Sequence, residues 1–189
     1  MTLQNWCPDL VTDHHTPALG EESSATFSQD RSYRYLLTRR WDTDWPYAVF
    51  IMLNPSTADS MTDDATIRRC RKFAQSWHAG GVLVANLFAL RSTTPRDLYT
   101  HPDPVGPDND AVLSWVFSTD HEVVGPVLAA WGVHGALHGR GDHVTRLLKA
   151  RAVRHLLCLG VTQDGHPRHP LYLANGTRAV EFPPKAEVA

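Results

Sequence analysis

Two unbroken apolar segments with a helical pattern between them constrain the fold of this chain most strongly. Residues 47–53 read Tyr-Ala-Val-Phe-Ile-Met-Leu, and residues 82–90 are apolar apart from Asn86. Short runs of this kind are typical of strands that are buried on both faces of a parallel sheet. The first run ends at Asn54-Pro55, because proline has no N–H to donate to a sheet ladder. Both segments are therefore predicted to lie in the centre of a sheet.

The pattern around these two runs predicts an α/β fold. Residues 64–77 place apolar side chains at three- and four-residue spacing, which predicts an amphipathic helix. The remaining predicted elements are a strand over 33–38, helices over 108–117 and 141–150, and strands over 122–131 and 155–159. Because strands alternate with helices, we expect a central, mainly parallel four-stranded sheet, with the strand over 33–38 as an N-terminal extension.

Length and composition are those of one domain. The chain has 189 residues, of which 42% are hydrophobic, and this is enough for a substantial core. Residues 1–25 are polar and have no sustained period, so we expect a flexible segment followed by a single domain over 26–189. No apolar stretch is long enough to span a membrane, and the N-terminus lacks a signal-peptide pattern. We therefore expect a cytoplasmic protein.

Charge and cysteine content exclude some classes of function. The three cysteines (Cys7, Cys70 and Cys158) have no Cys-x-x-Cys spacing, which argues against a disulfide framework and against a zinc or iron–sulfur site. The formal net charge is −2, whereas proteins that coat nucleic acid are usually strongly basic. Contacts to phosphate would therefore need a local patch. Arg68, with its neighbours Arg69, Arg71 and Lys72, forms either a solvated helix face or, together with Arg91 and Arg168, such a patch.

Polar residues gather where the predicted parallel strands end. Asn54-Pro55-Ser56 follows the first buried run, and residues 91–95 and 160–169 follow later strands. In open α/β sheets, ligands bind at the edge formed by the carboxyl ends of the strands. Asn86 lies inside an apolar strand, and an unpaired buried amide costs roughly 1–3 kcal/mol. Its partner is predicted to be either a neighbouring loop or a ligand with donors and acceptors on one edge, such as a nucleobase.

Histidine and aspartate supply the remaining candidate groups. His166 and His169 are three residues apart, but two prolines exclude a helix there and no third ligand is evident, so we expect no metal. His169 is either a surface residue or a source of a hydrogen bond or proton. Three carboxylates follow the Asn-Pro turn, namely Asp59, Asp63 and Asp64. We expect Asp63 to cap the helix that begins there, and one of the three carboxylates to orient a water molecule. Hydrolase-elbow, P-loop and dinucleotide motifs are missing, so the residues alone predict a polar pocket and no particular reaction.

Four segments, in order, resemble the uracil-DNA glycosylase superfamily. They are Met52-Leu53-Asn54-Pro55-Ser56, Ala85-Asn86-Leu87-Phe88-Ala89-Leu90-Arg91, Leu128-Ala129-Ala130-Trp131-Gly132 and His169-Pro170-Leu171. The chain also resembles a bacterial family described only as a domain of unknown function, which carries the signature Leu-Asn-Pro-Ser-Thr-Ala-Asp, here residues 53–59.

The glycosylase resemblance implies a three-layer αβα sandwich and a DNA glycosylase, a hydrolase that cleaves an N-glycosidic bond without metal or cofactor. It implies catalytic roles for Asn54 and His169, to which the carboxylates considered above add Asp59 as a candidate, and DNA as partner with the target base flipped out. The base would be bound by Asn86, Phe88, Pro55 and Ser56, and phosphates by Arg68, Arg91 and Arg168. Met52 stands where the superfamily has glycine and Leu171 where it has serine, so a modified or damaged base is as good a candidate as uracil.

Two alternatives stay open. One is a protein of the same fold that binds nucleic acid or nucleotides without catalysis, which the near-neutral charge favours. The other is a hydrolase of free nucleosides or nucleotides, which would need no basic DNA groove.

Overall fold

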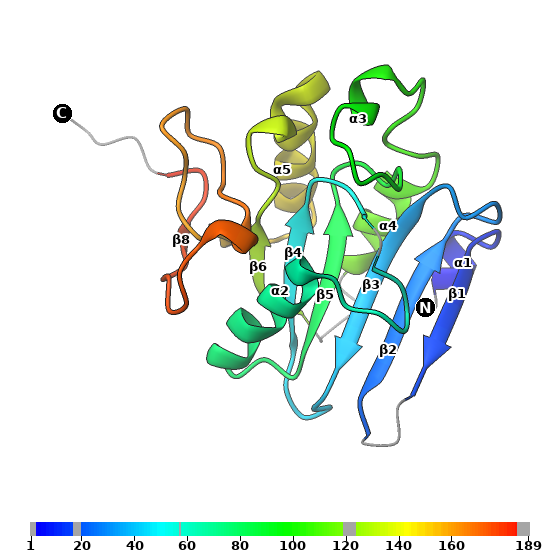
Figure 1. Ribbon diagram of the computed structural model, residues 1–189, viewed down its shortest axis with the longest axis horizontal. Helices are drawn as coiled ribbons and strands as arrows, with labels where there is room; N and C mark the ends of the chain where they lie inside the picture. The colour runs from blue at the N-terminus through cyan, green and yellow to red at the C-terminus, as the bar shows by residue number, and fades with distance from the viewer. Residues whose placement is uncertain (1–2, 17–19, 57, 119–123, 185–189) are drawn as a thin grey trace.

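The protein is an α/β fold built on one mixed sheet of eight strands (Figure 1). The computed structural model describes residues 3–16, 20–56, 58–118 and 124–184. The strand order is β1-β2-β3-β5-β4-β6-β7-β8. The four strands in the order β5-β4-β6-β7 are parallel to one another, whereas β1, β2 and β3 add to one edge, and β8 to the other, in antiparallel pairs.

The elements alternate along the chain much as the sequence predicts. The strands are β1 Val11–His15, β2 Glu22–Phe27, β3 Arg34–Arg40, β4 Tyr47–Met52, β5 Gly81–Asn86, β6 Val124–Ala129, β7 Leu156–Cys158 and β8 Val180–Glu181. The α-helices are α1 Leu3–Trp6, α2 Ala65–Ser76, α3 Asp97–Thr100, α4 Asn109–Val116 and α5 Arg140–Ala150, and the 3-10 helices are η1 Val133–Gly139 and η2 Pro170–Tyr172. The parallel four-stranded core is confirmed, but the sheet that contains it is twice as wide.

Alternating side chains of the sheet feed two separate cores. Along β4, Val49 and Ile51 belong to a cluster that also contains buried residues of α1, α4 and α5. Phe50 and Met52 point to the other cluster, which contains the buried side of α2. Helices therefore pack on both faces of the sheet, and the two-sided burial explains why the β4 segment is apolar throughout.

Strand β5 is shorter than predicted. It ends at Asn86, which pairs in register with Met52, the last residue of β4. The residues that follow continue beside the end of β4, where the N–H of Leu87 donates to Met52 and the N–H of Phe88 to Leu53. Asn86 is therefore not in the middle of a strand, and its position at the carboxyl edge is the one at which α/β sheets bind ligands.

Pro126 lies in β6 because the pairing with β4 is irregular at this point. Tyr47 pairs with Val124 and Val49 pairs with Val127, so β6 has one more residue than β4 over this interval. A bulge of this kind accommodates a residue that has no N–H for the ladder. The predicted strand over 122–131 begins with two residues, 122 and 123, that lie outside the described part of the chain.

The segment over residues 1–25, for which we expect flexibility, contains regular secondary structure in its described part. Within its described part, α1, β1 and most of β2 are formed, and Leu3, Cys7 and Leu10 are buried in the main core. β1 and β2 can be polar because pairs of hydroxyl groups across the strands stabilise their pairing. The hydroxyl oxygens of Thr12 and Thr26, for example, are 3.0 Å apart. Such pairs leave no apolar period for sequence reasoning to detect.

None of the helices in the described residues is both long and apolar enough to cross a membrane.

Candidate functional site

A cavity of about 550 Å³ opens at the carboxyl ends of the parallel strands. Its lining comes from the ends of β4 and β5, the first turn of α2, the start of η1 and the loop that leads into η2. Asn54, Asn86 and His169 all line it, although they are far apart in the sequence. Ser56 and Arg168 line it as well, so five of the ten predicted site residues share one cavity. The volume lies within the range of roughly 300–1,000 Å³ that is usual for small-molecule sites.

The other five predicted site residues do not line this cavity. Pro55 and Phe88 are buried, and Phe88 belongs to the core on the opposite face of the sheet from α2, so it has no face to offer a base. The carboxylate of Asp59 accepts the N–H groups of its own loop, as described below. The two remaining residues, Arg68 and Arg91, are cations that bind backbone carbonyls.

The carboxamide of Asn86 is buried without a partner. The residue is 1% exposed, and neither its oxygen nor its nitrogen makes a hydrogen bond to the described part of the chain. Its backbone carbonyl is occupied, because the side chain of Asn109 donates to it at 3.1 Å. An unpaired buried amide is destabilising, by roughly 1–3 kcal/mol for each group. The side chain therefore presents an unused donor and an unused acceptor in a cavity wall.

The side-chain nitrogen of Asn54 is hydrogen-bonded within the described part of the protein, whereas its side-chain oxygen is not. Its nitrogen donates to the carbonyl of Ser92 at 2.8 Å and makes longer contacts with the carbonyls of Pro55 and Leu90. The oxygen Oδ1 accepts no hydrogen bond from the residues that the structure describes. Asn54 thus ties the turn after β4 to the loop after β5, and only its oxygen is left as an acceptor.

Asp64 is the carboxylate that lines the cavity, and it is also the cap of α2. Its Oδ1 accepts the N–H of Ile67 at 2.8 Å, and its Oδ2 accepts the hydroxyl of Ser56 at 2.6 Å. The prediction that Asp63 caps this helix is therefore wrong. Asp63 forms ion pairs instead, with Arg39 and Arg71, because its side chain points away from the helix end towards β3.

His169 is a partly buried residue whose ring lines the cavity. Burial lowers the pKa of His169 below its ordinary value, although the negative charge of Asp64 opposes this effect. The ring is therefore neutral at neutral pH. Its Nδ1 accepts the N–H of Leu171 at 3.3 Å, which assigns the remaining proton to Nε2. The ring of the exposed Tyr172 lies 5.7 Å away between centroids, at the rim of the same cavity.

Arg34 is a cavity residue that sequence reasoning missed. It is 2% exposed, and its guanidinium donates from Nη1 to the carbonyl of Ala58, while Nε has no hydrogen-bond partner among the described residues. Burial lowers the pKa of Arg34 to about 10, with the nearby Asp64 raising it and Arg91 and Arg39 lowering it. It is therefore still charged at neutral pH. Within the described chain, no carboxylate lies within ion-pair distance of it.

An irregularity in β3 points Arg34 into the cavity. Thr26 of β2 pairs with Leu36, but the next residue, Phe27, pairs with Arg34, so Tyr35 is the extra residue of a bulge. Leu36 and Tyr35 therefore both belong to the core opposite α2, and Arg34 lies on the α2 face beside Met52 and Asn86. Bulges re-aim side chains in this way next to functional sites. The signal in the sequence is only a charged residue between two tyrosines in an otherwise apolar strand.

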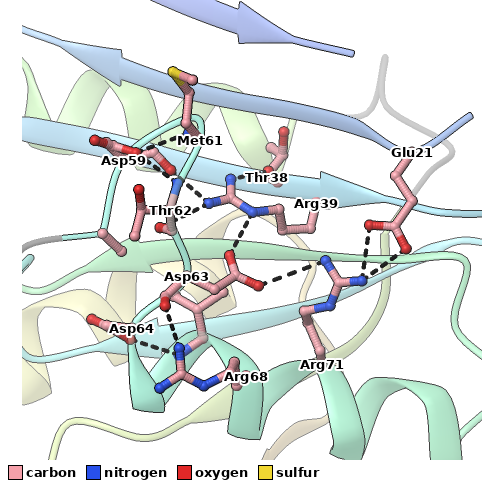
Figure 2. Close-up of polar contacts among 12 residues, drawn as sticks. Glu21, Thr38, Arg39, Asp59, Met61, Thr62, Asp63, Asp64, Arg68 and Arg71 are labelled. Carbon is pink, nitrogen blue, oxygen red and sulfur yellow. Dashed lines mark hydrogen bonds and ion pairs between the residues drawn. The ribbon is translucent and has the colours of Figure 1, made fainter. Parts of the chain in front are cut away.

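The loop between β4 and α2 is held by a network of charged residues (Figure 2). The guanidinium of Arg39, 3% exposed, donates to the carboxylate of Asp63 at 2.7 Å and to the carbonyl of Asp59 at 2.5 Å. The carboxylate of Asp59 accepts the N–H groups of Met61 and Thr62, both at 2.8 Å. Burial raises the pKa of Asp59, but these N–H groups and Arg39 outweigh it, so the pKa lies below the ordinary value. Asp59 therefore organises its loop.

The predicted basic patch is not one surface. Arg71 pairs with Glu21 at 2.9 Å, and Arg69 donates to the carbonyl of Pro170 at 3.4 Å, which joins α2 to η2. Arg91 donates to the carbonyl of Arg31. Arg168 alone among the three predicted phosphate-binding residues lines the cavity, where its Nε donates to Val161 at 3.0 Å.

Nothing in the described chain forms a cluster of side chains suited to a metal ion. The expectation that the protein binds no metal and no cofactor is not tested by this finding, and it stays a prediction. The three cysteines are free and buried.

Comparison with known proteins gives a family and no activity. No curated protein and no solved structure matches the chain. Nothing links it to the uracil-DNA glycosylases, so that resemblance stays a hypothesis. The resemblance to a domain-of-unknown-function family is confirmed, because residues 34–171 match a family described as "Protein of unknown function (DUF1643)". That match begins at Arg34, includes the cavity residues named above as far as Leu171, and covers most of the sequence, and the chain therefore belongs to this family.

Proposed function

We propose that the chain is an enzyme that binds a nucleobase in this cavity and hydrolyses the bond between that base and its sugar. DNA with the base flipped out is the expected substrate. One observation supports this above all: the unpaired, buried carboxamide of Asn86 shares a cavity with Asn54 and with the neutral His169. Helices on both faces of a mixed sheet with a parallel core are compatible with the three-layer αβα sandwich of the glycosylase superfamily.

Asn86 favours a ligand with an amide-like edge. A carboxamide offers one acceptor and one donor in a plane, and a pyrimidine edge offers the complementary pair. Because both groups of Asn86 are buried, a ligand that lacks one of them leaves a polar atom unpaired. A site of this kind discriminates against the wrong ligand much more strongly than an apolar pocket does. The apolar wall formed by Met52, Ile67 and Trp131 would contact the faces of the ring.

The proposed reaction begins with cleavage of the bond between C1′ of the sugar and the base nitrogen. The bonding electron pair leaves with the base, and the sugar becomes an oxocarbenium-like cation. The Nε2–H of His169 would donate to the base as negative charge develops on it, in the manner of an oxyanion hole. Removing one such donor typically lowers the rate by about 10²–10³. The neutral ring suits this role, because its proton stays on Nε2 while the hydrogen bond shortens.

Water then adds to C1′ and loses a proton. The free oxygen Oδ1 of Asn54 would accept a hydrogen bond from this water and orient it. Asp64 replaces Asp59 as the carboxylate of the mechanism, because Asp64 lines the cavity and Asp59 does not. Its negative charge would stabilise the sugar cation and receive the proton from the water.

Base release is the direct test. The purified protein is incubated with oligonucleotides that contain uracil, hypoxanthine or a hypermodified base, and with the matching free nucleosides, and free base is measured by chromatography. We expect release by the wild type and a loss of about 10²-fold or more in His169→Ala and in Asn86→Ala. His155→Ala is the matched control, because the side chain of His155 is 71% exposed and lies outside the cavity.

The variants also separate the alternatives. Asn86→Ala removes two unpaired polar atoms and no hydrogen bond from the described structure, so it is not expected to lower the free energy of unfolding. Release that is unchanged in both cavity variants contradicts the proposed site. Binding of the oligonucleotides by the wild type without any release would instead support the non-catalytic alternative, and release from nucleosides alone would support a hydrolase of free nucleosides.

A further inference from the structure

Arg34 has a charge that the described protein does not neutralise by contact. Its guanidinium has five N–H groups, and within the described residues one of its nitrogens, Nη1, donates a hydrogen bond, to the carbonyl of Ala58. Burial lowers its pKa most, the charges of Arg91 and Arg39 lower it as well, and the charges of Asp64 and Asp59 raise it without forming an ion pair with it. Each oxygen of Asp64 already accepts a hydrogen bond, from Ser56 and from the N–H of Ile67. A buried cation without a partner is strongly destabilising, so a group that restores its balance is expected to bind there.

We infer that Arg34 is an anion subsite of the cavity and that the ligand places a phosphate group on its guanidinium. The guanidinium of arginine forms a planar fork of N–H groups that matches phosphate oxygens. Arg34 and Asn86 lie at neighbouring ends of the adjacent strands β3 and β5, and both line the α2 side of the sheet. A ligand that spans them therefore carries a base and a phosphate, as a nucleotide does. The inference rests on the proposed function for the base but not for the phosphate.

The burial of Arg34 favours one source of this phosphate. An internal phosphate of a DNA strand is linked to a nucleoside on each side. Both nucleosides would have to enter the cavity for this phosphate to reach Arg34, which is 2% exposed. A terminal phosphate is linked to a single nucleoside. We therefore expect a free nucleoside monophosphate to fit this subsite better than an internal phosphate of DNA, so that a free nucleotide replaces the flipped-out DNA base of the proposed function as the substrate. The cavity volume of about 550 Å³ suits an entire small molecule.

The bulge at Tyr35 supports a role in binding over a role in folding. A regular β3 would point Arg34 away from α2, because side chains of a strand alternate between its two faces. The extra residue returns Arg34 to the α2 face, where its guanidinium gains one carbonyl contact. Arg40, at the other end of β3, provides a comparison, since it is also buried with one unpaired nitrogen but lies outside this cavity.

Calorimetric titration with inorganic phosphate tests the subsite without a base. We expect wild type to bind phosphate, Arg34→Gln to bind it at least about tenfold more weakly, and Arg40→Gln to match the wild type. A nucleoside 5′-monophosphate is expected to bind at least tenfold more tightly than its nucleoside, and Arg34→Gln to remove this preference. Equal affinity of wild type and Arg34→Gln for phosphate, or no binding by wild type, overturns the inference.

Tungstate, a heavy mimic of phosphate, keeps the test independent of variants that fail to fold. Crystals of the wild type soaked in tungstate are expected to show anomalous density within hydrogen-bonding distance of Arg34, and density only elsewhere, or none, overturns the inference. In competition with phosphate, displacement by the mononucleotide supports a free nucleotide as the source. Displacement by an oligonucleotide instead assigns the same subsite to a phosphate in a strand. If no base is ever released but phosphate binds at Arg34, the proposed reaction fails and the subsite stands.

Discussion

Removal of the Arg39 guanidinium is expected to loosen the wall of the cavity and to destabilise the whole protein. In Arg39→Met, the loop after β4 loses the bond to the carboxylate of Asp63 at 2.7 Å and the bond to the carbonyl of Asp59 at 2.5 Å (Figure 2). Breaking a buried ion pair by removing one partner typically destabilises by about 3–5 kcal/mol. Asp63 is 21% exposed and keeps Arg71 at 3.7 Å, which favours the lower end of that range.

We therefore expect the free energy of unfolding to fall by about 3 kcal/mol in Arg39→Met. For a chain of this length, each kcal/mol lowers Tm by about 2–4 °C, which predicts a decrease of about 6–12 °C. Differential scanning calorimetry and urea denaturation measure both quantities. Arg39→Lys keeps the charge but not the planar fork, so it is expected to fall between Met and the wild type.

Arg68→Met is the matched control for this experiment. Arg68 is also an arginine of the network, but it is exposed, and among the described residues its side chain donates to the backbone carbonyl of Asp63 alone. A change within about 0.5 kcal/mol is expected for such a surface position. If Arg39→Met lowers Tm no more than Arg68→Met does, the loop is not held by Arg39, and the reasoning from burial is refuted.

Two further predictions concern the walls of the cavity. Burial lowers the pKa of His169 in the folded protein, so the unfolded chain binds the proton of this histidine more tightly. The stability that His169 contributes is therefore complete above the pKa of the unfolded chain, about 6.5, and is lost as the pH falls below that value. The fall in unfolding free energy between pH 7.5 and 5.0 should thus be smaller in His169→Gln than in wild type, and equal falls would contradict the assignment. In Gly135→Ala, the new Cβ would lie 2.0 Å from the Trp131 ring, so we expect a loss of about 1–3 kcal/mol and altered tryptophan fluorescence; unchanged stability would show that this wall is free to move.

Much of the fold could be predicted because it depends on local patterns. The apolar run of β4 and the three- and four-residue period of α2 are both readable within a dozen residues, and both elements lie within two residues of the predicted bounds. The parallel strands followed from the alternation of these elements. The same logic predicted that Asn54, Asn86 and His169 would meet, because residues after parallel strands share one edge of the sheet. Their chemical roles remain predictions.

The antiparallel edge could not be predicted in the same way. Strands β1 and β2 are polar and short, and cross-strand partners hold them, as in the pair of Thr12 and Thr26. The roles of the carboxylates were equally hidden. Whether Asp63 or Asp64 caps α2 depends on the positions of two arginines that pair with Asp63. Arg39 comes from β3, and Arg71 comes from a later turn of α2.

The sequence by itself determined that this chain forms a parallel core with polar residues at one edge, because hydrophobic burial imposes a period that each segment carries on its own. The tertiary structure alone decided which side chains face the cavity and which of them lack partners. Arg34 is the clearest example: its direction depends on a bulge that exists only when β3 pairs with β2, and no described carboxylate lies within ion-pair distance of it. Pairing between distant segments leaves no periodic signal, and for that reason it had to be seen in three dimensions.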